Sequence, residues 1–195
     1  MIPIYNVQIT DAETGIDRIS LVEYPAVESN FLAFSDNKKT VMFSANEEQQ
    51  MIVGCLMRAD FPIYRKDEYG EYYIQFSKDV IKQMAEKLLK DGHQNWVNIE
   101  HINNTDVNDV NMVELFIKNT KNGINPKGFE QIEDGSLFAV FKVRNPKIWD
   151  YIKNDIFKGF SIEGVFNFAE TDNEDKTLDE IITMLDTIIE NRKYN

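Results

Sequence analysis

Few side chains in this sequence could carry acid–base or nucleophilic chemistry. It has two histidines, His93 and His101, and a single cysteine, Cys55. His93 lies in the polar run 91–94, just past a predicted helix end, which indicates a solvated or capping role. His101 ends the strand-like run 96–101. A strand end facing a loop can hold a base rigidly beside a substrate, although a lone histidine is also often structural.

Ser161 lies between Gly159 and Gly164 in a mostly apolar run. Glycines in a strand let another backbone, such as that of a substrate, approach closely. The spacing departs from the G-x-S-x-G of an α/β-hydrolase, because the second glycine comes one residue late and no helix is predicted to follow. The pattern therefore permits two interpretations, a nucleophile or a bulged strand with a buried hydroxyl.

Metal and nucleotide chemistry are poorly supported. There is no H-E-x-x-H, no C-x-x-C and no phosphate-binding G-x-x-x-x-G-K-[ST], and residues 106–109 lack the spacing and glycine of an EF-hand. We therefore predict no metal and no cofactor. The formal net charge of -12 argues against nucleic acid as a partner, because phosphate binding needs clustered Lys and Arg. The same charge does not exclude a basic protein partner.

The composition also predicts a compartment. With Cys55 alone, no intrachain disulfide can form, which favours a reducing environment. No run approaches the roughly 20 apolar residues of a membrane span. The first residues lack the basic start and apolar block of a signal peptide. We expect a soluble, intracellular protein without a membrane partner.

The hydrophobic pattern predicts an α+β fold. Short runs rich in branched and aromatic residues predict strands at 4–10, 19–22, 40–44, 50–57, 72–76, 96–99, 111–117, 137–143 and 159–168. Ser77 and Asn145 have the properties of N-caps for two helices, the first ending near residues 91–92 and the second running through Ile152. The expected architecture is a mainly antiparallel barrel or sandwich with inserted helices.

A third helix is predicted at the C-terminus, after a polar linker. Its apolar stripe comprises Leu178, Ile181, Ile182, Leu185, Ile188 and Ile189. Such a stripe must pack on the barrel, pair with a second copy or dock on a partner, and of these we favour docking on a partner helix. This gives a domain over residues 1–169 and an appendage, comprising the linker and the amphipathic helix, over residues 170–195.

Several short motifs follow one another along the chain: Ile99-Glu100-His101, Met112-Val113-Glu114, Trp149-Asp150-Tyr151-Ile152-Lys153 and Lys158-Gly159-Phe160-Ser161-Ile162. In this order they resemble the XkdF-like phage prohead proteases. These are relatives of the ordinary tailed-phage prohead proteases and, more distantly, of herpesvirus assemblin. The ordered set covers roughly residues 50 to 168 and is far more specific than any one piece.

A second similarity lies near the N-terminus. Residues 19–26, Ile-Ser-Leu-Val-Glu-Tyr-Pro-Ala, resemble a Val-Ser-Leu-Val-x-x-Pro-Ala strand that follows the catalytic serine in the ordinary prohead proteases. Here the strand precedes the motifs that contain His101 and Ser161, as it does in XkdF-like proteins. This order implies a circularly permuted domain.

The resemblance implies a serine endopeptidase on an assemblin-like β-barrel. Ser161 would be the nucleophile, and His101 would accept its proton. The third catalytic member is unassigned, because Arg18 stands where the relatives carry a Glu or His that orients the imidazole. Asp17, adjacent to Arg18, would need a bulge to reach the site, and Glu114 and Glu163 are further candidates.

Three functions follow. The first is an active maturation protease that cleaves scaffold and major capsid proteins inside the prohead, in the host cytoplasm. The second is an inactive relative kept as a structural or scaffolding component, for which Arg18 is the warning sign. The third is a cysteine hydrolase using Cys55 and His101, the least favoured because Cys55 lies in an apolar run where buried thiols are usually inert.

Overall fold

The computed structural model describes residues 2–28, 32–34 and 49–170. Its strands are β1 (Ile4–Gln8), β2 (Gly15–Val22), β3 (Leu32–Phe34), β4 (Met51–Met57), β5 (Ile63–Asp67), β6 (Gly70–Gln75), β7 (Val97–Ile99), β8 (Val110–Ile117), β9 (Leu137–Val143), β10 (Gly159–Val165) and β11 (Asn167–Glu170). Its helices are α1 (Lys78–Lys90) and α2 (Pro146–Lys153), with short 3-10 turns η1 (His93–Asn95) and η2 (Thr120–Asn122).

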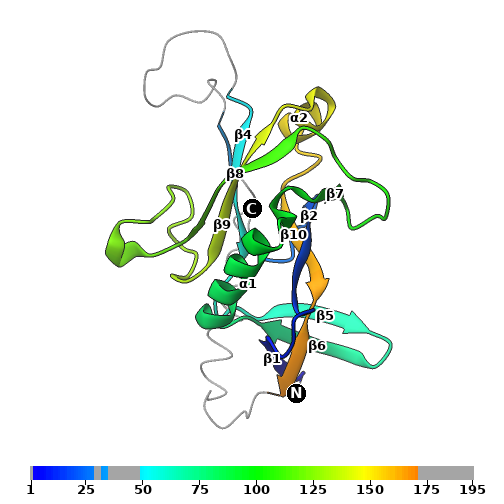
Figure 1. Ribbon diagram of the computed structural model, residues 1–195, viewed down its shortest axis with the longest axis vertical. Helices are drawn as coiled ribbons and strands as arrows, with labels where there is room; N and C mark the ends of the chain where they lie inside the picture. Colours follow the sequence, from blue (N-terminus) through cyan, green and yellow to red (C-terminus); the bar gives the residue numbers. More distant parts are fainter. Residues whose placement is uncertain (1, 29–31, 35–48, 171–195) are drawn as a thin grey trace.

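The strands form three sheets, with the orders β11-β1-β6-β5, β10-β2-β7 and β3-β4-β9-β8. Figure 1 shows the sheet of β4, β9 and β8 in the upper part of the view and that of β1, β6 and β5 in the lower part, with β2 and β10 between them. The chain passes from β1 to β2, and from β10 to β11, within a few residues. These two connections join the lower sheet to the middle one.

The α+β class is confirmed, but the described residues form no closed barrel. Pairing stops at β7, which is only three residues long. The outer edge of β7 is already occupied, since the Val107 amide donates to the Val97 carbonyl (2.8 Å) and the Thr105 hydroxyl contacts both backbone groups of Ile99. With these groups satisfied, no further strand can add to that edge. The circular permutation stays a prediction.

The helix boundaries follow the predicted caps. The Ser77 hydroxyl accepts a hydrogen bond from the Val80 amide at the start of α1, and Gly92 takes a left-handed conformation (φ 77°) just after its end. The Asn145 side chain accepts from the amides of Lys147 and Ile148 at the start of α2. Both predicted helices are confirmed where their caps placed them.

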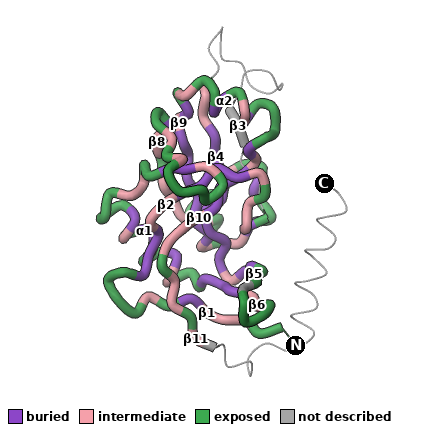
Figure 2. Tube along the Cα trace, turned by 90° about the vertical axis from the view of Figure 1, so that its right-hand side faces the viewer, coloured by how far each residue is buried: buried purple, intermediate pink, exposed green. Residues whose placement is uncertain are grey.

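The core lies where the upper and middle sheets meet, in the purple segments of β4, β9, β2 and β10 in Figure 2. Phe141 of β9 and Phe160 of β10 pack with ring centroids 5.0 Å apart, and both side chains are almost fully buried. These contacts fix one face of β10 against the core.

Most of the predicted strands within the described ranges are confirmed to within a few residues. The predicted strand 159–168 is divided in two, because β10 ends at Val165 and β11 begins at Asn167. The short β5 was not predicted, since its sequence Ile-Tyr-Arg-Lys-Asp is largely polar. The predicted strand 40–44 and the C-terminal helix, and with them the appendage 170–195 beyond Glu170, lie outside the described residues. Of the helices described, none is long and apolar enough to cross a membrane.

Candidate active site

The middle sheet carries a polar row on one face. Side chains alternate along a strand, so Phe160 and Ile162 point to one side of β10 while Ser161 and Glu163 point to the other. Ser161 lies directly opposite Ser20 of β2, and Ser20 lies opposite Asn98 of β7. Ser161, Ser20 and Asn98 therefore form a row across the three strands, on the face away from the Phe160 ring.

His101 reaches this row from a tight turn just after β7. Glu100 and His101 both have left-handed backbones (φ 50° and 58°), and the Ile102 amide donates to the Ile99 carbonyl (2.9 Å). The Thr105 hydroxyl contacts the carbonyls of Ile99 and Ile102 (3.1 and 2.6 Å), which ties the turn down. Positive φ values are costly for residues other than glycine and persist only where the surroundings enforce them. The turn thus holds His101 in a defined position.

The imidazole faces a carboxylate and a hydroxyl through the same nitrogen. His101 Nδ1 lies 3.1 Å from Glu163 Oε1 and 3.0 Å from Ser20 Oγ. The same carboxylate oxygen accepts from Ser20 Oγ (2.7 Å) and from Asn98 Nδ2 (2.6 Å). Ser20 Oγ also contacts Asn98 Oδ1 (2.5 Å). Four side chains from β2, β7, β10 and the turn after β7 therefore meet at one point.

The charge state of Glu163 follows from these contacts. Burial acts to raise the pKa of the Glu163 carboxyl, but hydrogen bonds from Ser20, Asn98 and His101 together outweigh it and lower the pKa below its usual value. Glu163 is therefore ionised at neutral pH. An anion beside Nδ1 favours the tautomer that carries its proton there, which leaves Nε2 free to accept one.

Ser161 keeps its hydroxyl available. The residue is 7% exposed, and none of the described residues forms a hydrogen bond with its Oγ. The same atom is not among the fully enclosed polar atoms that lack a partner, so it touches solvent. Ser20, by contrast, is 0% exposed and has three polar neighbours. Of the two facing serines, only Ser161 has some exposed surface and a hydroxyl without a hydrogen-bond partner among the described residues.

Ser161 and its predicted base His101 do not come from neighbouring strands, because β2 lies between β7 and β10. Within the described part of the chain no hydrogen bond joins Ser161 to His101. The two residues nevertheless belong to the same face, because Ser20 is opposite Ser161 and contacts His101. Glu163, two residues after Ser161, contacts the imidazole from the strand of Ser161 itself.

The other candidates for a third catalytic member lie elsewhere. Arg18 forms an ion pair with Asp106. Asp17 lies 3.9 Å from the other histidine, His93. Glu114 is exposed on β8, in a different sheet. Glu163 is the candidate that contacts His101.

His93 has a structural environment. Its ring stacks on Trp96 with centroids 4.0 Å apart, and its Nδ1 lies 3.4 Å from the Ile16 carbonyl. The pattern had indicated a solvated or capping role, and the structure instead places the ring against an aromatic side chain, only 20% exposed.

Cys55 cannot serve as a nucleophile in this fold. It is 0% exposed inside β4, where its thiol contacts the Met57 carbonyl at 3.3 Å. Burial raises the pKa of the thiol far above its usual value, so the reactive thiolate does not form at neutral pH. The cysteine hydrolase hypothesis is wrong.

Gly164 allows the backbones of β10 and β2 to approach closely. A Cβ at this position would lie 1.9 Å from the Gly15 carbonyl oxygen, because the backbones of β10 and β2 cross closely at a bulge between Glu163 and Gly164. The approach that glycine permits is therefore made by the protein's own strand. The bulged-strand interpretation is correct for Gly164, while the Ser161 hydroxyl remains accessible.

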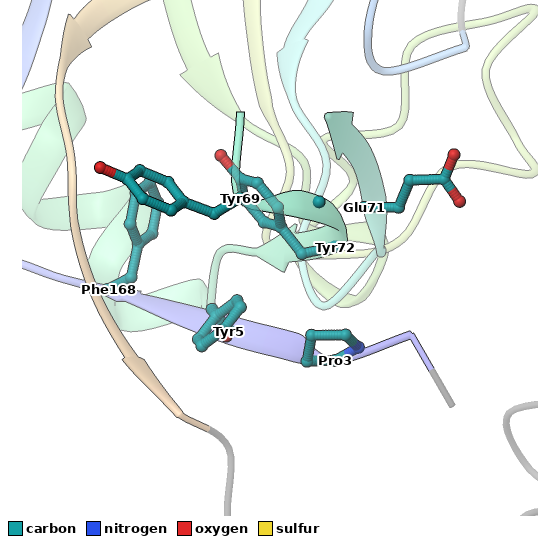
Figure 3. A pocket seen from close by; sticks show the side chains of 7 residues that line it. Pro3, Tyr5, Tyr69, Glu71, Tyr72 and Phe168 are labelled. Atoms are coloured by element: carbon teal, nitrogen blue, oxygen red, sulfur yellow. The ribbon is translucent and has the colours of Figure 1, made fainter. Parts of the chain in front are cut away.

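Described residues line at least two hollows. One, of about 310 Å³, is lined by Arg18, Asn95, Trp96, Val97, Asp106, Val107 and Asn108, and none of these belongs to the polar row. The other, of about 300 Å³, lies on the lower sheet between Tyr5, Tyr72 and Phe168, with Tyr69 over it (Figure 3). The lining of this second hollow includes no residue of the polar row.

A hydroxyl, an imidazole and a carboxylate on one face are the functional groups of a serine hydrolase. Nowhere in the ranges 2–28, 32–34 and 49–170 do three His, Cys, Asp or Glu side chains gather to hold a metal ion. Residues 38–170, more than half of the chain, match the family described as "Putative phage serine protease XkdF". The chain belongs to this phage serine protease family. Comparison with curated proteins and with solved structures gave no match.

Ser161, His101, Glu163 and Asn98 all lie within the matched range, whereas Ser20 precedes it. Ser20 and Asn98 are the site residues that sequence reasoning missed. Their contacts depend on the register of β2 between β7 and β10, which joins residues 78 and 143 positions apart.

Proposed function

We propose that the protein is a prohead maturation protease, a serine endopeptidase that cleaves scaffold and major capsid proteins during head assembly. Its place of action would be inside the prohead, in the host cytoplasm. Family membership supports a phage serine protease. The observation that carries the mechanism is the contact of His101 Nδ1 with Glu163, which leaves Nε2 available as a base on the face of Ser161.

In this mechanism Ser161, His101 and Glu163 act as a triad. Ser161 Oγ attacks the scissile carbonyl carbon while its proton passes to His101 Nε2. Glu163 stabilises the imidazolium that forms. The C–N bond then breaks, and the leaving amine takes the proton from Nε2. A water molecule, deprotonated by the same nitrogen, hydrolyses the acyl-enzyme and releases Ser161.

Arg18 does not prevent this chemistry. The carboxylate that orients the imidazole comes from β10, two residues after the nucleophile, instead of from the Arg18 position on β2. Arg18 is already paired with Asp106. In this proposal Glu163 of the neighbouring strand takes the place of the carboxylate that is missing at Arg18, so Arg18 does not imply an inactive protein.

The alternative, an inactive relative that serves as a structural component of the capsid, has one observation in its favour. No hydrogen bond joins Ser161 and His101 among the residues that the structure describes. Catalytic hydrogen bonds are often long without substrate and tighten in the complex, so this observation is compatible with an active enzyme. Cleavage decides between the two functions.

The decisive assay is incubation of the cognate scaffold protein with wild type and with Ser161→Ala. Ser136 offers a matched control, because it is also a buried serine (0% exposed) but contacts the Ala59 amide in another part of the fold. Wild type and Ser136→Ala should produce fragments, and Ser161→Ala should produce none. Equal cleavage by Ser161→Ala, or none by a folded wild type, contradicts the proposal.

We also propose that residues 171–195 recruit the scaffold or a second copy of the chain through the predicted apolar stripe. This proposal rests on the sequence, since the segment lies outside the described residues. Deleting it should weaken self-association or scaffold binding in sedimentation experiments while a short peptide is still cleaved. A truncated chain that is unfolded would contradict it, because the stripe would then belong to the core.

A further inference from the structure

The buried side of the polar row contains two groups with no assigned role in the reaction. Ser20 is 0% exposed and Asn98 is 2% exposed, yet both direct polar atoms at Glu163. Buried polar groups are costly unless paired, and the Asn98 amide has both an acceptor and donors to satisfy. Ser20 and Asn98 satisfy these groups by converging on one carboxylate oxygen beside His101.

The number of protons on Ser20 and Asn98 determines which of their atoms donate and which accept. Asn98 directs Nδ2 at Glu163 Oε1 (2.6 Å), so its Oδ1 faces Ser20 (2.5 Å) and can only accept. Ser20 has one proton and two lone pairs. Its two oxygen neighbours, Asn98 Oδ1 and the Glu163 carboxylate, both accept, so the hydroxyl proton goes to one of them. A lone pair of Ser20 then remains for His101.

His101 Nδ1 thus faces two acceptors, the lone pair of Ser20 at 3.0 Å and the Glu163 carboxylate at 3.1 Å. A nitrogen between two acceptors must carry its proton. The neutral imidazole is then in the Nδ1–H form, with Nε2 unprotonated, which is the form a general base requires.

We propose that Ser20 and Asn98 are positioning residues that fix the Nδ1–H tautomer of His101 by orienting and hydrogen-bonding Glu163. The proposal rests on the triad proposed above and deepens it. Neither residue contacts the substrate in this account, since both are buried members of the row. Ser20 is a partner of the imidazole, and the facing Ser161 is the nucleophile.

The test uses the fact that the chain has only two histidines. In ¹⁵N-histidine NMR of the full chain at alkaline pH, each imidazole reports which nitrogen is protonated, and His93 serves as the internal control for folding. Wild type and the control Ser136→Ala should show His101 as Nδ1–H. Ser20→Ala and Asn98→Ala should each shift His101 toward the Nε2–H form while the His93 signals stay in place.

Turnover of a short peptide provides the second readout. Ser20→Ala and Asn98→Ala should each lower kcat by about 10- to 100-fold, the value of one hydrogen bond to a charged group, with little change in KM. Unchanged His101 tautomers in both variants, or a lower kcat without a tautomer shift, would overturn the positioning role.

The two proposals fail in different ways. The NMR readout does not need turnover, so an inactive wild type with the expected tautomers would contradict the protease function alone. If Ser20→Ala abolished cleavage as completely as Ser161→Ala and left the tautomer unchanged, Ser20 would be the nucleophile and the positioning proposal would be wrong.

Discussion

Two polar clusters of this protein, one around Lys118 and one around Glu163, differ in what they leave unpaired. Around Lys118, the ammonium donates to the carbonyls of Phe129, Glu130 and Ile132, which uses all three of its protons. On the middle sheet, the contacts among Ser20, Asn98, Glu163 and His101 end at two groups that remain unused, the Ser161 hydroxyl and His101 Nε2.

Whether all hydrogen-bonding groups of a cluster are paired distinguishes the structural cluster from the candidate catalytic one. A cluster whose donors and acceptors are all paired has nothing left to offer a substrate, and it stabilises the loop that it ties together. A cluster that fixes an imidazole and leaves its far nitrogen free, near an accessible hydroxyl, has the capacity for proton transfer.

The largest expected loss of kcat follows from replacing Ser161 or His101. Ser161→Ala and His101→Ala should each lower kcat by about 10⁴-fold or more, because each removes a member of a unit that acts together. The double variant should be no slower than either single variant. Peptide turnover with circular dichroism as the folding control measures this, and additive losses or unfolding of both variants would indicate structural roles.

Removing the carboxylate should have the next largest effect. Glu163→Gln keeps the shape of the side chain but removes the charge that stabilises the imidazolium, so kcat should fall by about 10³- to 10⁴-fold. A turnover rate within about tenfold of wild type would exclude Glu163 from the triad.

Glu163 also predicts a pH dependence of stability. Because folding lowers the pKa of its carboxyl, the ionised group stabilises the native state above its unfolded pKa, and this contribution is lost as pH falls through the folded value. Wild type should therefore exceed Glu163→Gln in the free energy of unfolding at neutral pH, and the difference should shrink on acidification. A difference that grows as pH falls would contradict the assigned charge state.

In the Lys118 cluster, a substitution should lower stability and leave kcat nearly unchanged. Lys118→Met removes the donor for three carbonyls, and Lys118 is only 2% exposed. Each buried acceptor left without a partner costs about 1–3 kcal/mol, so urea unfolding should show a loss of roughly 3 kcal/mol or more. The kcat per folded molecule should stay within about twofold of wild type. A large fall in kcat at unchanged stability would remove the distinction between the two clusters.

The smallest effect is expected at Arg18. Its ion pair with Asp106 is partly exposed (36% and 63% for the two side chains), and such pairs contribute about 0–1 kcal/mol. Arg18→Ala should therefore change kcat by less than about threefold. A strong gain in kcat would show that Arg18 opposes the imidazole after all, and that the Glu163 carboxylate does not fully replace the missing group.

Local signals predicted the helices well, because caps act on the residues next to them. Ser77 and Asn145 are the N-caps of α1 and α2, as expected. The sheets were predicted less completely. β7, β2 and β10 are distant in the sequence, and the sequence of a short strand does not specify which strand it pairs with.

The same reasoning explains what was missed at the site. Ser20 lay in a strand that resemblance had singled out, but its contact with His101 depends on register. Glu163 could have been chosen earlier, because residues two apart on a strand share a face, and Ser161 and Glu163 are so spaced. The bulge that follows Glu163 then brings its carboxylate to the imidazole, and no pattern in the sequence predicts that reach.

The central claim is that Ser161 is the nucleophile activated by His101. A fluorophosphonate probe, which reacts with activated serine hydroxyls, tests it directly when the labelled residue is mapped by mass spectrometry. We expect the label on Ser161 in wild type and in Ser136→Ala, and no label in His101→Ala. A label on Ser20, or equal labelling of Ser161 when His101 is absent, would contradict the account.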